Sequence, residues 1–134
     1  MDQTYSMIKP EIVAAGDQKI GEILAIIQRA GFRIVNIKMK QLERETVELF
    51  YDVHKERPFY GELVDYICSG PVVALHLERE SAVVKLRELV GATNPEDAAC
   101  GTIRDLYGKS LSENAIHASD SVENGLREIG IIFG

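Results

Sequence analysis

Hydrophobic and polar positions repeat with two different periods along this chain, and together they predict alternating strands and helices. Period-two alternation and short apolar runs predict strands, and these occur at four places: Thr4 to Lys9, Val35 to Lys40, Val72 to Leu77 and Ala115 to Ala118. Apolar spacings of three and four residues predict helices, and the stripes begin at Ile20, Val47, Leu63, Val83 and Val122. The polar positions between Val35 and Lys40 predict that this strand has one face in water.

The order of these elements predicts the fold class. Strand, helix, strand, two short helices, strand, helix, loop, strand and helix reduce to two βαβ-like halves. This order predicts an α+β ferredoxin-like sandwich, in which helices cover an antiparallel four-stranded sheet. Pro10 is expected to end the first strand. The periodicity fades between Ala92 and Ser112 among glycine, proline and asparagine, which predicts a long loop before the last strand.

Composition narrows the choice of function. At 134 residues the chain is long enough for one domain, from 1 to 134, and too short for two ordinary ones. A net charge of −6 argues against nucleic acid as a partner, because the phosphate backbone requires a basic face. No apolar run approaches the roughly 20 residues that span a bilayer, and no secretory leader is recognisable, so we expect no membrane partner and a cytoplasmic location. Cys68 and Cys100 lack a metal-ligand spacing and are expected to be reduced, partly buried thiols.

His117 is the residue best suited to chemistry, because it ends a short apolar strand just before a helix begins. Asp120 and Glu123, three residues apart, are typical of a capping box at the start of that helix. A side chain at such a junction can be held rigidly while it still faces a cleft, which suits a nucleophile or an acid–base group. An isolated histidine at a strand end is more often merely polar, so its flanking residues decide the interpretation.

The sequence contains none of the common glycine-rich loops that bind phosphate groups. Gly108, Lys109 and Ser110 imitate the end of a P-loop, but the required first glycine would fall at Ile103 and no strand precedes it. The sequence also lacks a Rossmann glycine fingerprint and a protein-kinase glycine-rich loop. Phosphoryl transfer by this protein would therefore need another device.

The octet from Asn114 to Ser121 resembles the active-site signature of nucleoside diphosphate kinases, Asn-x-x-His-Gly-Ser-Asp-Ser, whose histidine carries the transferred phosphoryl group. Ala118 departs from it, since the family usually has glycine there. Other segments match the family in order: Ile8 to Pro10, His54 to Phe59, Ser69 to Val72, Arg87, Gly91 to Pro95 and Gly101 to Arg104. Glu11 follows the first of these where the family normally has aspartate. The resemblance covers essentially the whole chain.

The resemblance implies a role for each matching residue. His117 would be the catalytic nucleophile, and Glu128 would hydrogen-bond one ring nitrogen and leave the other unprotonated for attack. Tyr51 and Ser119 would help to orient the ring. The nucleotide would be held by six residues: Lys9, Arg87, Thr93 and Arg104 at the phosphates, Asn114 with Lys9 at the ribose, and Phe59 at the base.

The base site implied by the resemblance would not discriminate among nucleotides. Stacking on Phe59, with Leu63 and, as a further candidate, Leu111 on the other side, tolerates any base because each has a π-face. His54 would lie near the α-phosphate. His76 alternates with two leucines in a predicted strand and is expected to be structural only.

The implied activity is the transfer of a γ-phosphoryl group from a nucleoside triphosphate to a nucleoside diphosphate, by a ping-pong mechanism through a phosphohistidine. Mg²⁺ would arrive on the nucleotide, so no all-protein metal site is expected. The resemblance also implies a homo-oligomer, either a tetramer or a hexamer. Two other interpretations stay open from the residues: a catalytically idle binding module of the same family, which the presence of the implied site residues disfavours, and a ferredoxin-like small-molecule sensor.

Overall fold

The computed structural model describes residues 1–134, apart from the side chain of Asp17. Four strands form one sheet in the order β2-β3-β1-β4, with bounds β1 (Asp2–Ile8), β2 (Arg33–Lys40), β3 (Val72–Arg79) and β4 (Ile116–Ala118). Every neighbouring pair is antiparallel. In the pairing of β1 with β4, Met7 lies opposite His117. The α+β ferredoxin-like fold expected from the sequence is confirmed.

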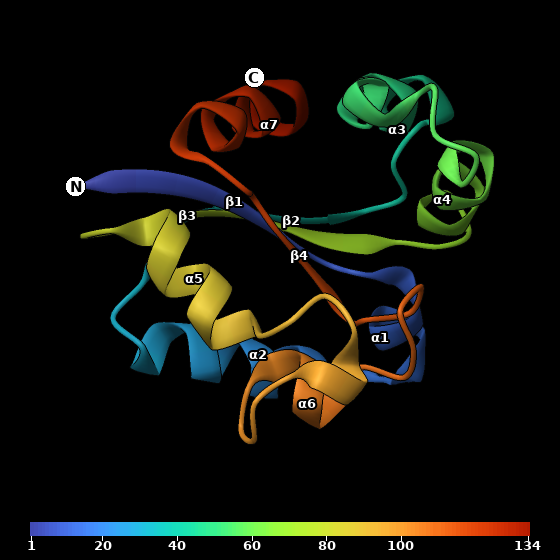
Figure 1. Ribbon diagram of the computed structural model, residues 1–134. Coiled ribbons are helices and arrows are strands. Elements are labelled where there is room, and N and C mark those ends of the chain that lie inside the picture. Colours follow the sequence, from blue (N-terminus) through green and yellow to red (C-terminus); the bar gives the residue numbers. More distant parts are fainter.

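Helices cover both faces of this sheet (Figure 1). The α-helices are α1 (Pro10–Ala15), α2 (Asp17–Arg29), α3 (Arg44–Phe50), α4 (Tyr60–Ile67), α5 (Ala82–Val90), α6 (Ile103–Tyr107) and α7 (Val122–Phe133), and the short 3₁₀ helices are η1 (Asp52–His54) and η2 (Pro95–Asp97). Figure 1 shows α3, α4 and α7 on one side of the sheet and α1, α2, α5 and α6 on the other. Each side has its own apolar core, one around Tyr5 and Phe50 and one around Ile8 and Leu86.

Two helices lie where the sequence analysis placed none. Pro10 does end β1, but it also begins α1, because its fixed φ suits the first position of a helix. The predicted loop from Ala92 to Ser112 contains η2 and α6. Helix α6 is only 5 residues long and is capped by the preceding Thr102, whose hydroxyl accepts a hydrogen bond from the Asp105 backbone amide. An element of this length is too short for an apolar stripe to reveal it.

Three local expectations need correction. The side chain that caps α7 is Ser121, which accepts from the Asn124 amide, whereas Asp120 accepts from the side-chain amide of Asn124. The apolar positions of β2 are not covered by this chain, since Val35, Ile37 and Met39 are 37%, 45% and 57% exposed. Partial burial was expected of both cysteines, but Cys68 is half-buried and Cys100 is exposed; both are free thiols. Among the described residues, no helix is long and apolar enough to cross a bilayer.

Candidate active site

The catalytic candidate His117 lies in β4 and is paired with a glutamate of α7. Nε2 of His117 is 2.9 Å from Oε1 of Glu128, and the Ser119 hydroxyl donates to the same oxygen at 2.6 Å. The side-chain amide of Asn124 donates to the other oxygen of Glu128, Oε2, at 3.2 Å. The Glu128 carboxylate is buried, and these hydrogen bonds hold it in one position. Donation from Nε2 to the carboxylate fixes the tautomer of the ring and leaves the lone pair on Nδ1 free to attack an electrophile.

A series of aromatic rings leads from His117 along the end of α3 to Phe59, just before α4. The Phe50 and Tyr5 rings lie 5.2 Å and 5.7 Å from the imidazole, centroid to centroid. The Tyr51 ring then lies 4.8 Å from Phe50, and the series continues to His54 at 6.4 Å and from His54 to Phe59 at 6.2 Å. Phe59 ends the series and is 45% exposed, which leaves a face open to a ligand.

Tyr51 and Tyr5 are both buried beside the Glu128 carboxylate. Burial raises the pKa of each phenol, and the charge of Glu128 raises each pKa further. Both phenols are therefore neutral at physiological pH and can act only as hydrogen-bond donors or acceptors. The rings nearest to His117 are those of Phe50 and Tyr5, so Tyr51 adjoins the imidazole through Phe50.

A tight turn connects Asn114 with the strand that carries His117. Ala115 has φ 78°, and the Ile116 amide donates to the Asn114 carbonyl at 3.0 Å, which closes a three-residue γ-turn. The Asn114 side chain is fixed from two sides, because it accepts from Lys9 Nζ at 2.6 Å and donates to the Thr93 carbonyl at 2.9 Å. These contacts bring together three residues that the sequence assigned to the nucleotide.

The cations of the site are held close together and partly buried. Burial, with repulsion from Arg104, lowers the pKa of Lys9 to about 8, although the charge of Glu11 acts in the opposite direction. Burial, with repulsion from Arg87, likewise lowers the pKa of Arg104 to about 10. Arg104 donates to the carbonyls of Gly91 and Ile116 at 3.0 Å and 2.8 Å. Cations that repel one another in the free protein are relieved by a polyanion, so this cluster favours phosphate groups.

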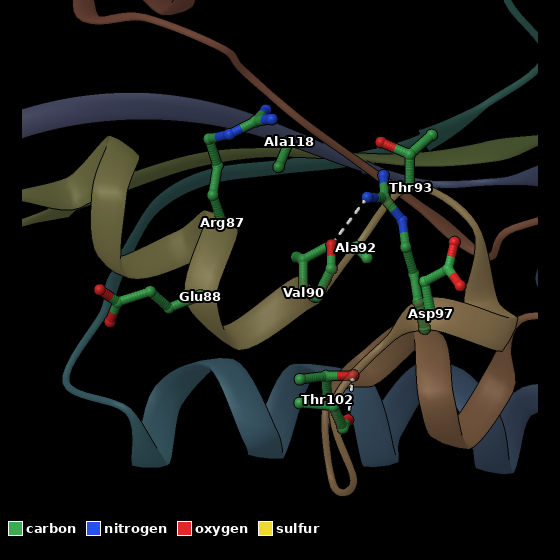
Figure 2. A pocket seen from close by; sticks show the side chains of 11 residues that line it. Arg87, Glu88, Val90, Ala92, Thr93, Asp97, Thr102 and Ala118 are labelled. Carbon is green, nitrogen blue, oxygen red and sulfur yellow. Dashed lines mark hydrogen bonds between the residues drawn. The ribbon is translucent and has the colours of Figure 1, made fainter.

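A cavity of ≈ 430 Å³ lies between the end of α5, the segment that follows it and β4 (Figure 2). It is lined by Arg87, Thr93 and Arg104 among the predicted phosphate ligands, and by Ala118. His117 is not part of this lining, because alternate residues of a strand point to opposite faces and its ring packs with Tyr5 and Phe50. The bond from Arg104 to the Ile116 carbonyl connects the cavity with the segment that carries His117.

Comparison with known proteins identifies the family. A family model described as nucleoside diphosphate kinase matches residues 2–134. The chain belongs to the nucleoside diphosphate kinase family. Nucleoside diphosphate kinases of Chlamydia felis and Chlamydia caviae are 54% and 53% identical to it over 133 residues, which cover 99% of this chain and 93% of each relative.

Solved structures of the family agree with this assignment. The structure of the Aquifex aeolicus nucleoside diphosphate kinase superposes with a TM-score of 0.95 at 41% identity, covering 99% of this chain and 95% of that one. A halophilic nucleoside diphosphate kinase from Halobacterium salinarum, solved in complex with CDP, superposes with a TM-score of 0.93 at 38% identity and covers 99% and 88%. The family resemblance in the sequence is thus confirmed, and the chain is an enzyme, a nucleotide-binding kinase of this family.

The predicted residues of this kinase fall into two groups around the segment Asn114 to His117. Hydrogen bonds join Lys9 and Thr93 to the Asn114 side chain and Arg104 to the Ile116 carbonyl. Arg87 lies with Arg104 along the cavity. The second group, Tyr51, His54 and Phe59, follows the aromatic series. Leu63 is half-buried and Leu111 is exposed. His76 pairs with Gln3 at 3.0 Å on the sheet, away from both groups.

The sequence analysis missed several polar side chains of the site. Glu11 accepts from the Ala115 amide at 3.0 Å and from the Tyr66 hydroxyl, and Asn124 supports Glu128. Tyr5 lies directly against the imidazole ring. Glu11 gave a signal, since it directly follows the matched segment Ile8 to Pro10 where the family normally has another carboxylate, aspartate, but nothing local reveals a partner 104 positions away.

Proposed function

We propose that the enzyme works by a ping-pong mechanism with His117 as the nucleophile. The Nδ1 lone pair attacks the γ-phosphorus of a nucleoside triphosphate. The bond between this phosphorus and the oxygen that bridges the β- and γ-phosphates breaks, and a nucleoside diphosphate leaves. The phosphoryl group then passes from Nδ1 to the terminal oxygen of a second diphosphate. The observation that carries this proposal is the 2.9 Å bond between Nε2 and Glu128, because it stabilises the positive charge that develops on the ring during attack.

The phosphates are proposed to bind at the cation cluster of Lys9, Arg87 and Arg104. Catalysis of phosphoryl transfer depends on positioning and on neutralising the transferring group, which fixed cations provide. Asn114, held by Lys9, is proposed to bind the ribose. Phe59 is proposed to stack on the base, and because its exposed ring offers a π-face and no base-edge donor, the enzyme would accept all common bases.

Mg²⁺ is proposed to enter with the nucleotide as part of the substrate. Within the part of the chain that the structure describes, no three His, Cys, Asp or Glu side chains are grouped as metal ligands. A Mg²⁺ ion carried by the nucleotide would take its ligands from phosphate and water, so it would need no ligand cage from the protein.

The proposal is tested by incubation with ATP labelled in the γ-phosphate. Label that is acid-labile and alkali-stable should appear on the protein and should leave on addition of an unlabelled nucleoside diphosphate. His117→Ala should abolish the label and still bind ADP, because other residues hold the phosphates and the base. A variant that exchanged phosphate at the parent rate would exclude His117 as the nucleophile. Parent protein that bound ADP without taking up label would point to an idle binding module.

The assembly is proposed to be a tetramer or a hexamer of this chain. The apolar side chains of β2 support an assembly, because Val35, Ile37 and Met39 lie exposed along an edge strand of the sheet. Light scattering or native mass spectrometry measures the number of subunits directly, and a monomer at micromolar concentration would contradict the proposal.

A further inference from the structure

Glu11 connects three parts of the fold beside the active site, although the mechanism above assigns it no role. It lies in the first turn of α1, two residues after Lys9. Its carboxylate accepts a hydrogen bond from the Ala115 amide at 3.0 Å and another from the hydroxyl of Tyr66 in α4. A single side chain thus fixes the entry to β4 against α1 and α4.

The peptide that Glu11 holds is strained. Ala115 has φ 78°, a conformation that alanine adopts at a cost because of its Cβ. Such a residue persists only where its surroundings hold it in place. Here the Ala115 carbonyl accepts from the Lys9 amide at 2.9 Å, while its own amide donates to Glu11. The turn separates Asn114 from the strand of His117, so it sets how these two residues lie relative to each other.

The same carboxylate also acts on the charge of Lys9. The groups that face Lys9 are Arg104 from α6, Glu11 from α1, the Tyr66 ring from α4 with its centroid 5.7 Å from Nζ, and the Asn114 amide. Burial and Arg104 lower the pKa of Lys9, Glu11 raises it, and the net result is a pKa of about 8. Without Glu11, a smaller fraction of Lys9 would carry a proton at physiological pH.

We propose that Glu11 is a positioning residue for phosphoryl transfer, which locks the turn at Ala115 in the geometry that the active site needs and keeps Lys9 in its cationic form. This inference rests on the proposed function, because it assumes that Lys9 and Asn114 hold the nucleotide. Glu11 touches neither substrate nor the reacting nitrogen. It acts through the Ala115 peptide and through the field at Lys9.

The test measures ADP affinity from pH 6.5 to 9.5 by calorimetry, together with kcat, for Glu11→Gln and the parent. ADP affinity of the parent should fall as the pH rises through the pKa of Lys9. In Glu11→Gln the midpoint of this fall should move to lower pH, because a neutral amide does not favour the ammonium form. The kcat should fall about tenfold, since a neutral acceptor binds the Ala115 amide less strongly than a carboxylate does. Glu11→Asp, which keeps the charge, should leave the midpoint unchanged.

Glu22→Gln is the matched control. Glu22 accepts from the Tyr107 hydroxyl at 2.8 Å and so loses the same kind of Tyr–Glu bond, but between α2 and α6. It should leave the midpoint and kcat unchanged. The proposal is overturned if Glu11→Gln matches the parent, if Glu22→Gln reproduces its effects, or if kcat falls while the midpoint stays, since the last result indicates a purely structural role.

Two further measurements keep the result decisive. If Glu11→Gln fails to fold, as circular dichroism would show, Tyr66→Phe removes only the hydroxyl that anchors the carboxylate. It should lower kcat about threefold with an unmoved midpoint, and a parent-like kcat would overturn the proposal. The ADP titration requires no phosphoryl transfer. A parent protein that binds ADP but takes up no label would therefore contradict the proposed mechanism, whereas the effect of Glu11 on the pH dependence of ADP binding would still be measurable.

Discussion

Glu128 Oε1 and His117 Nε2 are 2.9 Å apart, and this pair determines which ring nitrogen carries the proton. Glu128 lies in α7 and His117 in β4, so the helix that follows the strand of His117 supplies the hydrogen-bond partner of its ring. The burial of the carboxylate and its bonds from Ser119 and Asn124 leave it little freedom to move. Nδ1 is consequently the ring nitrogen whose lone pair stays free, as the proposed mechanism requires.

Glu128→Gln should therefore lower kcat by about tenfold or more, with a smaller change in KM. The amide keeps the shape of the side chain but stabilises less of the positive charge that the ring gains during attack, so the loss belongs to the transition state. Steady-state rates with ATP and a second diphosphate measure it. Glu123→Gln, at an exposed position of the same helix, is the control. Unchanged kcat, or a rise in KM alone, would make Glu128 a structural residue.

Arg104→Ala should reduce kcat/KM far more than Lys109→Ala. Arg104 lines the cavity and is fixed by two backbone carbonyls, whereas Lys109 is exposed in the broken imitation of a P-loop. Loss of one charged contact to phosphate is worth on the order of 1.5–3 kcal/mol, which corresponds to a tenfold to hundredfold effect or slightly more. The reverse order would support phosphate binding at Gly108 to Ser110.

Lys9→Met should flatten the dependence of stability on pH between about 8 and 10.5. The folded pKa of Lys9, about 8, lies below the ordinary lysine value of 10.5, so the unfolded chain binds more protons in this range and the parent gains stability as the pH rises. Below pH 8 the full cost of burying the ammonium is present. The gain is on the order of 3 kcal/mol, from about 1.4 kcal/mol per pKa unit.

Urea unfolding of the parent and Lys9→Met at pH 7.5 and 10 measures this difference. Titrating groups remote from Lys9 affect both proteins alike, so the comparison reports Lys9 together with Arg104, whose charge interacts with it. Removal of Lys9 also costs the bond to Asn114, which shifts the Met variant by a similar amount at both pH values. Parallel changes in the two proteins would show that Lys9 titrates normally in the folded state.

Ala118→Gly should keep activity near the parent level and lower stability by about 0.5–1 kcal/mol. Ala118 lies in β4, where the backbone is extended, so the alanine carries no conformational strain that glycine would relieve. Glycine increases the conformational entropy of the unfolded chain and adds no stabilising contact in the strand. Chemical unfolding and steady-state rates measure both effects. A more stable glycine variant would indicate that the Ala118 side chain is crowded where it borders the cavity.

The sequence by itself predicted the strands and most of the helices, and it singled out His117 as the candidate nucleophile. These features are local: strand alternation, helical stripes and the octet from Asn114 to Ser121 are visible within a few residues of each other. The order of the elements was enough to predict the antiparallel sheet, because few topologies connect two βαβ-like halves. Helices α1 and α6 were not predicted, because they are only 6 and 5 residues long and show too little apolar periodicity.

Only the tertiary structure decided how the site residues meet. The bond between Ala115 and Glu11 joins positions 104 apart, and that between Lys9 and Asn114 joins positions 105 apart. The left-handed backbone of Ala115, the choice of Nε2 as the partner of Glu128 and the depressed pKa of Lys9 follow from such contacts. No local pattern encodes them, because the burial and the fixed partners that produce them exist only once the sheet has brought β1 beside β4.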